Sequence, residues 1–176
     1  MAPPGLACCR YRQASLEDVH AMALIRSREW GDEVYWRGRI GDYLRREANP
    51  VQALPPRAAY VALFGNLTVG FIAGHLSQRF GCQGELQWIN VLSEHRKRGI
   101  AQVLLRFMAG WFDARRAARV CVDVHPSNAA ARAFYARQGA RPLQPNWMVW
   151  DDIARLSIHS RPAAGAPDLS TRGEKR

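Results

Sequence analysis

The sequence predicts a mixed α/β protein, in which about four helices flank a mostly antiparallel sheet of six or seven strands. Apolar runs of strand length gather in the first half of the chain, and strands alternate with helices in the second half. A polar turn that contains a glycine joins the strand at 85–91 to a helical pattern, and another strand follows at 119–124. A helix between two neighbouring strands makes those strands parallel. A length of 176 residues suits one domain with one core.

The first elements are a short strand and two helices. We expect the strand at 9–11. Ser15 is a good N-cap, and two acidic residues follow it, so a helix is predicted from there to about Arg26. A second helix is expected from about Tyr35 to Glu47. Prolines at 50, 55 and 56 then break the pattern.

A hairpin is expected next, because Gly65-Asn66 separates two β-rich runs at 58–64 and 67–76. The parallel pair described above follows a loop at 78–84. The remaining predicted elements are a helix at 128–138, ended by Gly139, and one or two strands around Leu143 and 147–150.

The composition sets limits on partners and surroundings. The net charge of +10 and the pI of about 10.3 fit a polyanionic partner, although part of the excess lies near the C-terminus. The four cysteines lack metal-binding spacing, so we expect reduced thiols, a cytoplasmic location and no metal. No apolar run approaches the roughly 18 residues of a membrane span, and the first residues lack the features of a signal peptide. Residues 1–7 and 159–176 are predicted to be disordered, which leaves a domain at 8–158.

The segment from Glu85 to Gly110 carries the clearest chemical signal. Its strand ends in the basic turn Arg96-Lys97-Arg98-Gly99, and a helical pattern begins directly after the glycine. The first N–H groups of a helix have no partner inside it and therefore bind anions. Gly99 allows the backbone to approach a phosphate closely. These features predict a pyrophosphate site at the turn.

Two motifs resemble those of the GCN5-related N-acetyltransferase (GNAT) superfamily. Residues 96–101, Arg-Lys-Arg-Gly-Ile-Ala, match its signature Gln/Arg-x-x-Gly-x-Gly/Ala, and the match falls between a strand and a helix. The second signature is filled by Asn128, Ala131, Tyr135 and Gly139. The resemblance covers roughly residues 9–152, and the two motifs together make it specific.

The resemblance implies acetyl-coenzyme A (acetyl-CoA) as donor and a primary amine as acceptor. It also implies that strands four and five splay at a bulge, where the pantetheine arm inserts. The cofactor-binding residues that it implies are Ile89, Asn90 and Val91 on the strand, Arg96, Lys97, Arg98, Gly99, Ile100 and Ala101 at the turn, and Asn128 and Tyr135 beyond.

Two residues are candidates for catalysis. Tyr135, with a reference pKa of about 10, is a proton donor at neutral pH, or alternatively a core aromatic residue. Glu85 lies eleven residues before Arg96, the offset of the catalytic glutamate in the histone-acetylating branch, and is otherwise an ordinary polar residue at a strand start. His95 and His125 are further candidates for the base, with structural or solvated roles as the alternative.

The acceptor stays open at this point. Aromatic and acidic residues at 30–36 suit either a cleft for a cationic amine or helix packing. A small amine, an antibiotic, a peptide N-terminus and a protein lysine all remain candidates. The alternatives to an enzyme are a non-catalytic acyl-CoA sensor and a nucleic-acid binder, and scattered basic charges argue against the latter. The resemblance makes a homodimer plausible.

Overall fold

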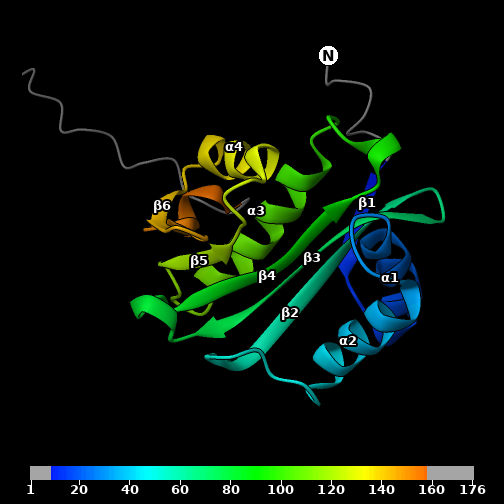
Figure 1. The fold of residues 1–176 in the computed structure, drawn as a ribbon, viewed down its shortest axis with the longest axis horizontal. Coiled ribbons are helices and arrows are strands. Elements are labelled where there is room, and N and C mark those ends of the chain that lie inside the picture. Colours follow the sequence, from blue (N-terminus) through cyan, green and yellow to red (C-terminus); the bar gives the residue numbers. More distant parts are fainter. Residues whose placement is uncertain (1–8, 158–176) are drawn as a thin grey trace, which may run out of the picture.

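A single seven-stranded sheet forms the centre of the protein (Figure 1), in a computed structural model that describes residues 9–157. The strand order is β1-β2-β3-β4-β5-β7-β6, and every neighbouring pair is antiparallel except β4 and β5, which are parallel. This confirms the predicted fold class. The strands are β1 (Cys9–Gln13), β2 (Ala53–Phe64), β3 (Leu67–Ser77), β4 (Gly84–Val91), β5 (Val120–Asp123), β6 (Arg141–Gln144) and β7 (Trp147–Trp150).

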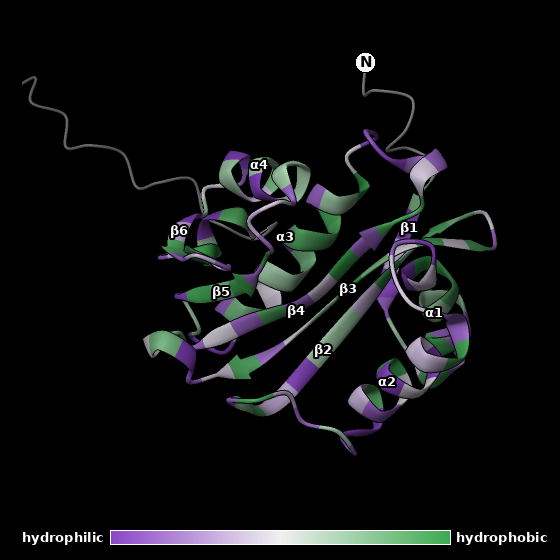
Figure 2. Ribbon diagram, in the orientation of Figure 1, coloured by the Kyte–Doolittle hydropathy of each residue, from purple (hydrophilic) through white to green (hydrophobic). Residues whose placement is uncertain are grey.

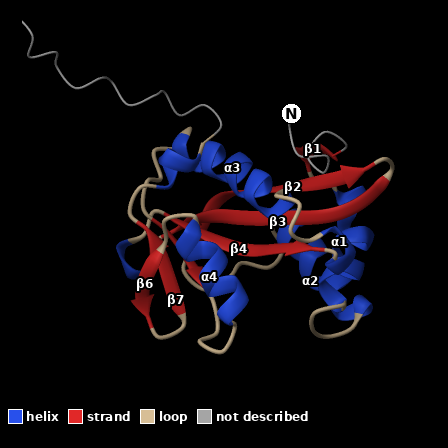
Figure 3. Cartoon of the chain, turned by 90° about the horizontal axis from the view of Figure 1, so that it is seen from above, coloured by secondary structure: helices blue, strands red, loops and turns tan. Residues whose placement is uncertain are grey.

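Within residues 9–157, four α-helices cover the two faces of the sheet. Figure 3 shows α3 on one face and α1, α2 and α4 on the other. The helices are α1 (Val19–Ser27), α2 (Glu33–Arg45), α3 (Ile100–Asp113) and α4 (Ala129–Arg137). Figure 2 shows how strongly the hydrophobic residues concentrate in the strands and in α3. Leu104, Leu105, Met108 and Phe112 of α3 are completely buried, so this helix anchors the core behind β2, β3 and β4.

The helix starts follow from local hydrogen bonds. Ser15 precedes a short 3-10 turn at Leu16–Asp18, which leads into α1, and its backbone N–H donates to the Asp18 carboxylate at 2.8 Å. Asp32 caps α2 by accepting a hydrogen bond from the Tyr35 N–H at 2.8 Å. Helix α1 therefore begins at Val19, later than predicted, and α2 begins at Glu33, two residues earlier than predicted.

The strand β2 differs most from its predicted extent. It begins at Ala53 and passes through Pro55-Pro56, with a register irregularity between Leu54 and Arg57. Over this stretch β2 pairs only with β3, because β1 pairs with β2 from Tyr60 onwards. Prolines are tolerated along such an unpaired edge, because no neighbouring strand there needs a hydrogen bond from the N–H that proline lacks. The proline pair therefore interrupts the ladder without ending the strand.

The parallel ladder between β4 and β5 is short. It consists of three pairs, Gly84–Val120, Glu85–Cys121 and Leu86–Val122. The strand β4 continues to Val91, whereas β5 ends at Asp123. The register between β3 and β4 also skips Gln87, which forms a bulge. The two strands therefore separate beyond Leu86, as the family resemblance implied.

The remaining predictions concern surroundings and chain ends. Within residues 9–157, none of the helices has the length and apolar character needed to cross a membrane. Cys82 and Cys121 are buried and form no disulfide. Cys8 and the segments predicted to be disordered at 1–7 and 159–176 lie outside the described residues.

Candidate active site

A cavity of about 620 Å³ opens where β4 and β5 separate. Its walls come from residues 87–91 of β4, residues 122–125 at the end of β5, the first part of α4, and Arg26 at the end of α1. Trp88, Ile89, Val122, Val124 and Phe134 supply apolar surface. Beyond the short parallel ladder, β4 keeps β3 on one side, and its other edge faces this space and not a neighbouring strand. An extended molecule with amide groups can therefore hydrogen-bond there as an added strand would.

The predicted anion site lies beside the cavity at the start of α3. Gly99 caps the helix with φ of +79°, in the left-handed region that favours glycine. The Gly99 carbonyl accepts the first helical hydrogen bond from the Val103 N–H at 3.1 Å, so the N–H groups before Val103 have no partner within the helix. Lys97 and Arg98 are exposed at the same turn. Ala101 and Arg96 also line the cavity.

Arg96 has a structural task in addition to its charge. Its Nε donates to the Val91 carbonyl at 3.0 Å, and its guanidinium pairs with Glu29 from the loop after α1. These contacts hold the basic turn against the end of β4. The sequence predicted Arg96, Lys97 and Arg98 as one basic group, but in the structure Arg96 braces the turn while Lys97 and Arg98 extend into solvent.

Asn128 and Tyr135 are brought to the cavity by α4. Asn128 caps this helix, with its Oδ1 accepting from the Ala131 N–H at 3.1 Å. About two turns later, Tyr135 is buried, and its ring lies edge-on to Trp150 with centroids 5.6 Å apart. Burial raises the pKa of Tyr135, and the nearby Arg26 charge opposes that rise. Tyr135 therefore carries its proton at neutral pH. Asn128 suits its position because it caps α4, and Tyr135 suits its position because its ring packs against Trp150.

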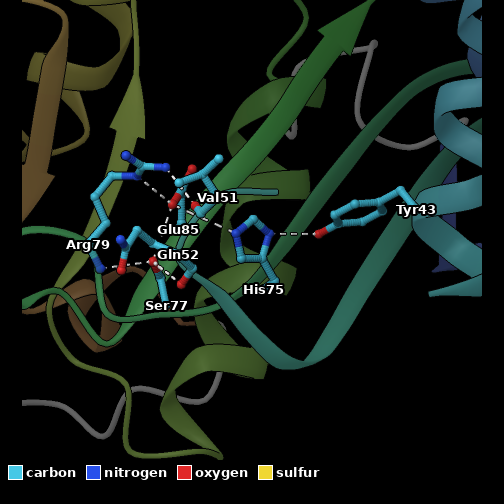
Figure 4. Close-up of polar contacts among 7 residues, drawn as sticks. All are labelled: Tyr43, Val51, Gln52, His75, Ser77, Arg79 and Glu85. Carbon is cyan, nitrogen blue, oxygen red and sulfur yellow. Dashed lines mark hydrogen bonds and ion pairs between the residues drawn. The ribbon is translucent and has the colours of Figure 1, made fainter. Parts of the chain in front are cut away.

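Glu85 is placed differently from the other predicted site residues. It is buried within the ladder and does not line the cavity. Its Oε2 accepts hydrogen bonds from Ser77 Oγ at 3.2 Å and Arg79 Nε at 3.1 Å, and lies 3.7 Å from His75 Nε2 (Figure 4). His75 Nδ1 is in turn 3.0 Å from the Tyr43 hydroxyl. Burial opposes ionisation, but His75 and Arg79 outweigh it and lower the pKa of Glu85.

Asp123 is a carboxylate that does line the cavity, as does Glu29, and the sequence argument passed over it. It stands at the end of β5, one residue beyond the last rung of the parallel ladder. Its side chain makes no hydrogen bond or ion pair with any residue in the described range. Desolvation and then the negative charge of Glu85 raise the pKa of Asp123. A polar residue where a strand ends beside its parallel neighbour is the signal that points to it.

The two histidine candidates, His125 and His95, lie in different environments. His125 lines the cavity, and its Nδ1 accepts a hydrogen bond from the Ser127 N–H at 3.2 Å. His95 packs against Phe64, with ring centroids 5.4 Å apart, and does not line the cavity. Within residues 9–157, no group of histidine, cysteine and acidic side chains is arranged to hold a metal ion.

The aromatic and acidic segment at 30–36 contributes to the packing of α2 against the sheet. None of its residues lines the cavity. Trp36 is buried against Trp88, with ring centroids 6.0 Å apart, and its indole N–H donates to the Trp30 carbonyl. Asp32 caps α2. Of the two interpretations left open by the sequence, these contacts favour helix packing over an acceptor cleft. The segment touches Trp88, and Trp88 in turn lines the cavity.

The sequence of residues 19–140 matches the family model described as the acetyltransferase (GNAT) family. The chain belongs to the GNAT family. A curated relative, an uncharacterised N-acetyltransferase from Methanocaldococcus jannaschii, is 32% identical over 119 residues, which cover 66% of this chain and 74% of that protein.

Solved structures share the GNAT fold at lower identity. The PaiA N-acetyltransferase of Thermoplasma acidophilum in complex with coenzyme A is 15% identical, with a TM-score of 0.64 over 82% of this chain and 98% of that one. Ard1 from Thermoplasma volcanium is 17% identical, with a TM-score of 0.64 over 81% and 96%. The ribosomal-protein-alanine N-acetyltransferase of Brucella melitensis is 19% identical, with a TM-score of 0.58 over 77% and 94%.

Family membership agrees with the chemistry of the cavity. The N-terminus of α3 and the exposed Lys97 and Arg98 fit a pyrophosphate. The unpaired stretch of β4 fits the amide groups of a pantetheine arm, and the cavity has room for it. This GNAT protein is therefore an acetyltransferase whose cosubstrate is acetyl-CoA.

Proposed function

We propose that this protein transfers the acetyl group of acetyl-CoA to a primary amine, with Asp123 accepting the ammonium proton and Tyr135 donating to the departing sulfur. The observation that carries this proposal is the convergence of three groups on one cavity. These are the unpaired backbone of β4, the carboxylate of Asp123 and the buried hydroxyl-bearing ring of Tyr135. The start of α3 lies at the end of the same cavity.

The cosubstrate is proposed to lie along β4. The backbone of Ile89, Asn90 and Val91 would bind the acyl carbonyl and the pantetheine amides, and Asn128 would contact the arm from α4. The N–H groups around Ile100 would hold the pyrophosphate. This arrangement fixes the thioester near Tyr135, and positioning of this kind lowers the barrier by removing the entropy cost of bringing reactants together.

Tyr135 suits the departing sulfur because burial keeps it protonated. A thiol has a reference pKa of about 8.5, so the leaving group departs as a thiolate at neutral pH unless a donor stabilises it. The Tyr135 hydroxyl can donate that hydrogen bond as the C–S bond breaks.

Asp123 suits the amine better than Glu85 does. A primary amine with a pKa of about 10 arrives as an ammonium ion and must lose a proton before it attacks. Asp123 has a raised pKa and an open position in the cavity, whereas Glu85 has a lowered pKa and donors on its carboxylate. A carboxylate with a higher pKa is the stronger base. We assign the ammonium to Asp123, and to Glu85 the task of holding the ladder together.

The test combines binding and turnover. Acetyl-CoA should raise the melting temperature, because a ligand that binds only the folded state stabilises it. Coenzyme A thiol should then be released with at least one member of a panel of small amines and peptides. Tyr135→Phe should lower kcat by about 100-fold or more, in line with the loss of one acid-base group, and keep the acetyl-CoA melting shift.

Two results would count against this proposal. A melting shift without thiol release from any amine would indicate an acyl-CoA sensor. Unchanged kcat in Tyr135→Phe would remove the assigned role from that residue. Phe134→Leu, next to Tyr135 and also lining the cavity, serves as a matched control because it changes packing without removing a hydroxyl.

A further inference from the structure

Arg26 brings a positive charge to the cavity from the end of α1. Its Nη1 donates to Asn90 Oδ1 at 3.2 Å, and its guanidinium carbon lies 4.7 Å from the centre of the Trp36 ring. Its Nε is buried without a hydrogen-bond partner in the described chain. No carboxylate between residues 9 and 157 forms an ion pair with Arg26. This half-buried cation therefore lacks a counter-ion.

The other charged side chains of the cavity are already engaged, with one exception. Glu29 pairs with Arg96, and His125 is bonded to Ser127. The exception is Asp123, whose carboxylate makes no hydrogen bond or ion pair within the described residues, although Arg79 and His125 favour its ionised form. Two charges of opposite sign are thus left for a ligand, one on α1 and one at the end of β5.

We propose that the acceptor carries a carboxylate beside its amine, as an α-amino acid does, with Arg26 binding the carboxylate and Asp123 the ammonium. This inference rests on the proposed function and specifies its substrate class. It follows from the complementarity of a zwitterion to one unpaired cation and one unpaired anion in a single cavity.

Arginine is well suited to this task. Its planar guanidinium presents parallel N–H donors that match the two oxygens of a carboxylate. The contacts with Asn90 and Trp36 fix the plane of the Arg26 guanidinium before a ligand arrives. Burial without a counter-ion lowers the pKa of Arg26, so an incoming carboxylate would relieve an existing desolvation cost.

The position of Arg26 favours the acceptor over the cosubstrate phosphates. Arg26 lines the same cavity as Tyr135 and is close enough to oppose the rise in the Tyr135 pKa, and Tyr135 marks the reacting end of the cavity. The anion site for pyrophosphate is formed by other residues, at the start of α3. A cation at the reacting end also repels a second ammonium group, so a diamine fits this cavity poorly.

The experiment compares acceptors that differ only in the carboxylate. Thiol release is measured with phenylalanine, phenylalaninamide and phenethylamine, with the matched leucine series, with putrescine and with a tripeptide that has a neutral side chain next to its free N-terminus. The wild type should favour the amino acid over its amide and amine by about 10- to 100-fold in kcat/KM, the range expected for a charge-assisted pair.

Variants identify the residue responsible. Arg26→Gln should abolish the preference for the carboxylate and leave the KM for acetyl-CoA unchanged. Arg26→Lys, which keeps the charge but loses the planar fork, should retain part of the preference and provides a second test if the glutamine variant folds poorly. Arg106→Gln, an exposed arginine on α3, is the matched control and should behave as the wild type.

Distinct results would overturn the inference. Preference for the amide, for putrescine or for the tripeptide would contradict a carboxylate site while leaving acetyl transfer in place. An equal fall in kcat for all acceptors in Arg26→Gln would assign Arg26 to the departing sulfur, and a raised KM for acetyl-CoA would assign it to the cosubstrate. Absence of thiol release from every acceptor, with acetyl-CoA binding intact, would overturn the proposed function itself.

Discussion

Glu85 and Asp123 are two carboxylates on adjacent parallel strands with opposite surroundings. Glu85 lies inside the three-rung ladder between β4 and β5, opposite Cys121, whereas Asp123 lies one residue beyond its last rung. Inside the ladder, donors from β3 and the following turn surround the carboxylate and its pKa falls. Beyond the ladder, the carboxylate meets an open cavity and its pKa rises. The point at which the strands separate thus decides which carboxylate is available to a substrate.

The largest expected effect concerns turnover. Asp123→Asn should lower kcat/KM for the amine by about 100-fold or more, because a general base contributes roughly 10²- to 10⁴-fold. Glu85→Gln should lower it by less than about 10-fold, since that side chain does not reach the cavity. Steady-state thiol release with both variants provides the measurement. A greater loss in Glu85→Gln would reverse the two assignments and restore Glu85 as the base.

The second effect concerns stability, and here Glu85→Gln should have a larger effect than Asp123→Asn. Glu85→Gln should lower the free energy of unfolding by about 2 kcal/mol, because it weakens hydrogen bonds from charged or buried donors. Asp123→Asn should change it by no more than about 0.5 kcal/mol, as expected for an exposed side chain with no partner. Thermal melting without ligand measures both values. Equal destabilisation by the two variants would contradict the contrast between a closed and an open site.

The smallest effect is a difference in pH dependence. The pKa of Glu85 is lower in the folded protein than its usual value of about 4.3. Its ionised form therefore stabilises the folded state above that value, and this contribution disappears as the pH falls through the folded pKa. The melting temperatures of the wild type and Glu85→Gln should converge as the pH falls below about 4.3. A gap that stays constant with pH would show that Glu85 acts through packing alone.

Much of the fold could be predicted from local patterns. The turn at residues 96–99 and the helix after it were predicted because Gly99 and the basic residues before it are adjacent in the sequence, so no tertiary information was needed. The hairpin at Gly65-Asn66 was predicted for the same reason, because its turn signal lies in adjacent residues. The early start of β2 was missed because Pro55-Pro56 breaks a central strand but not an edge, and the sequence does not say which strand is an edge.

The site residues required tertiary information that spacing does not carry. An offset of eleven residues placed Glu85 on the right strand, yet the direction of its side chain depends on strand alternation and on the bulge at Gln87. Asp123 could be found only by knowing that β5 ends where β4 continues. Arg26 follows the buried positions Val19, Met22, Ala23 and Ile25 of α1, but helical periodicity cannot say that the next residue faces a cavity.

The short ladder between β4 and β5 also gives this sheet an edge in its interior. Along residues 87–91, β4 has β3 on one side and no strand on the other, so the amide hydrogens directed away from β3 should exchange faster than those of β3, which is paired on both sides. The pantetheine arm proposed to lie there would complete the sheet. Acetyl-CoA would then serve as a removable structural element, and each release of coenzyme A would return the centre of the protein to its least protected state.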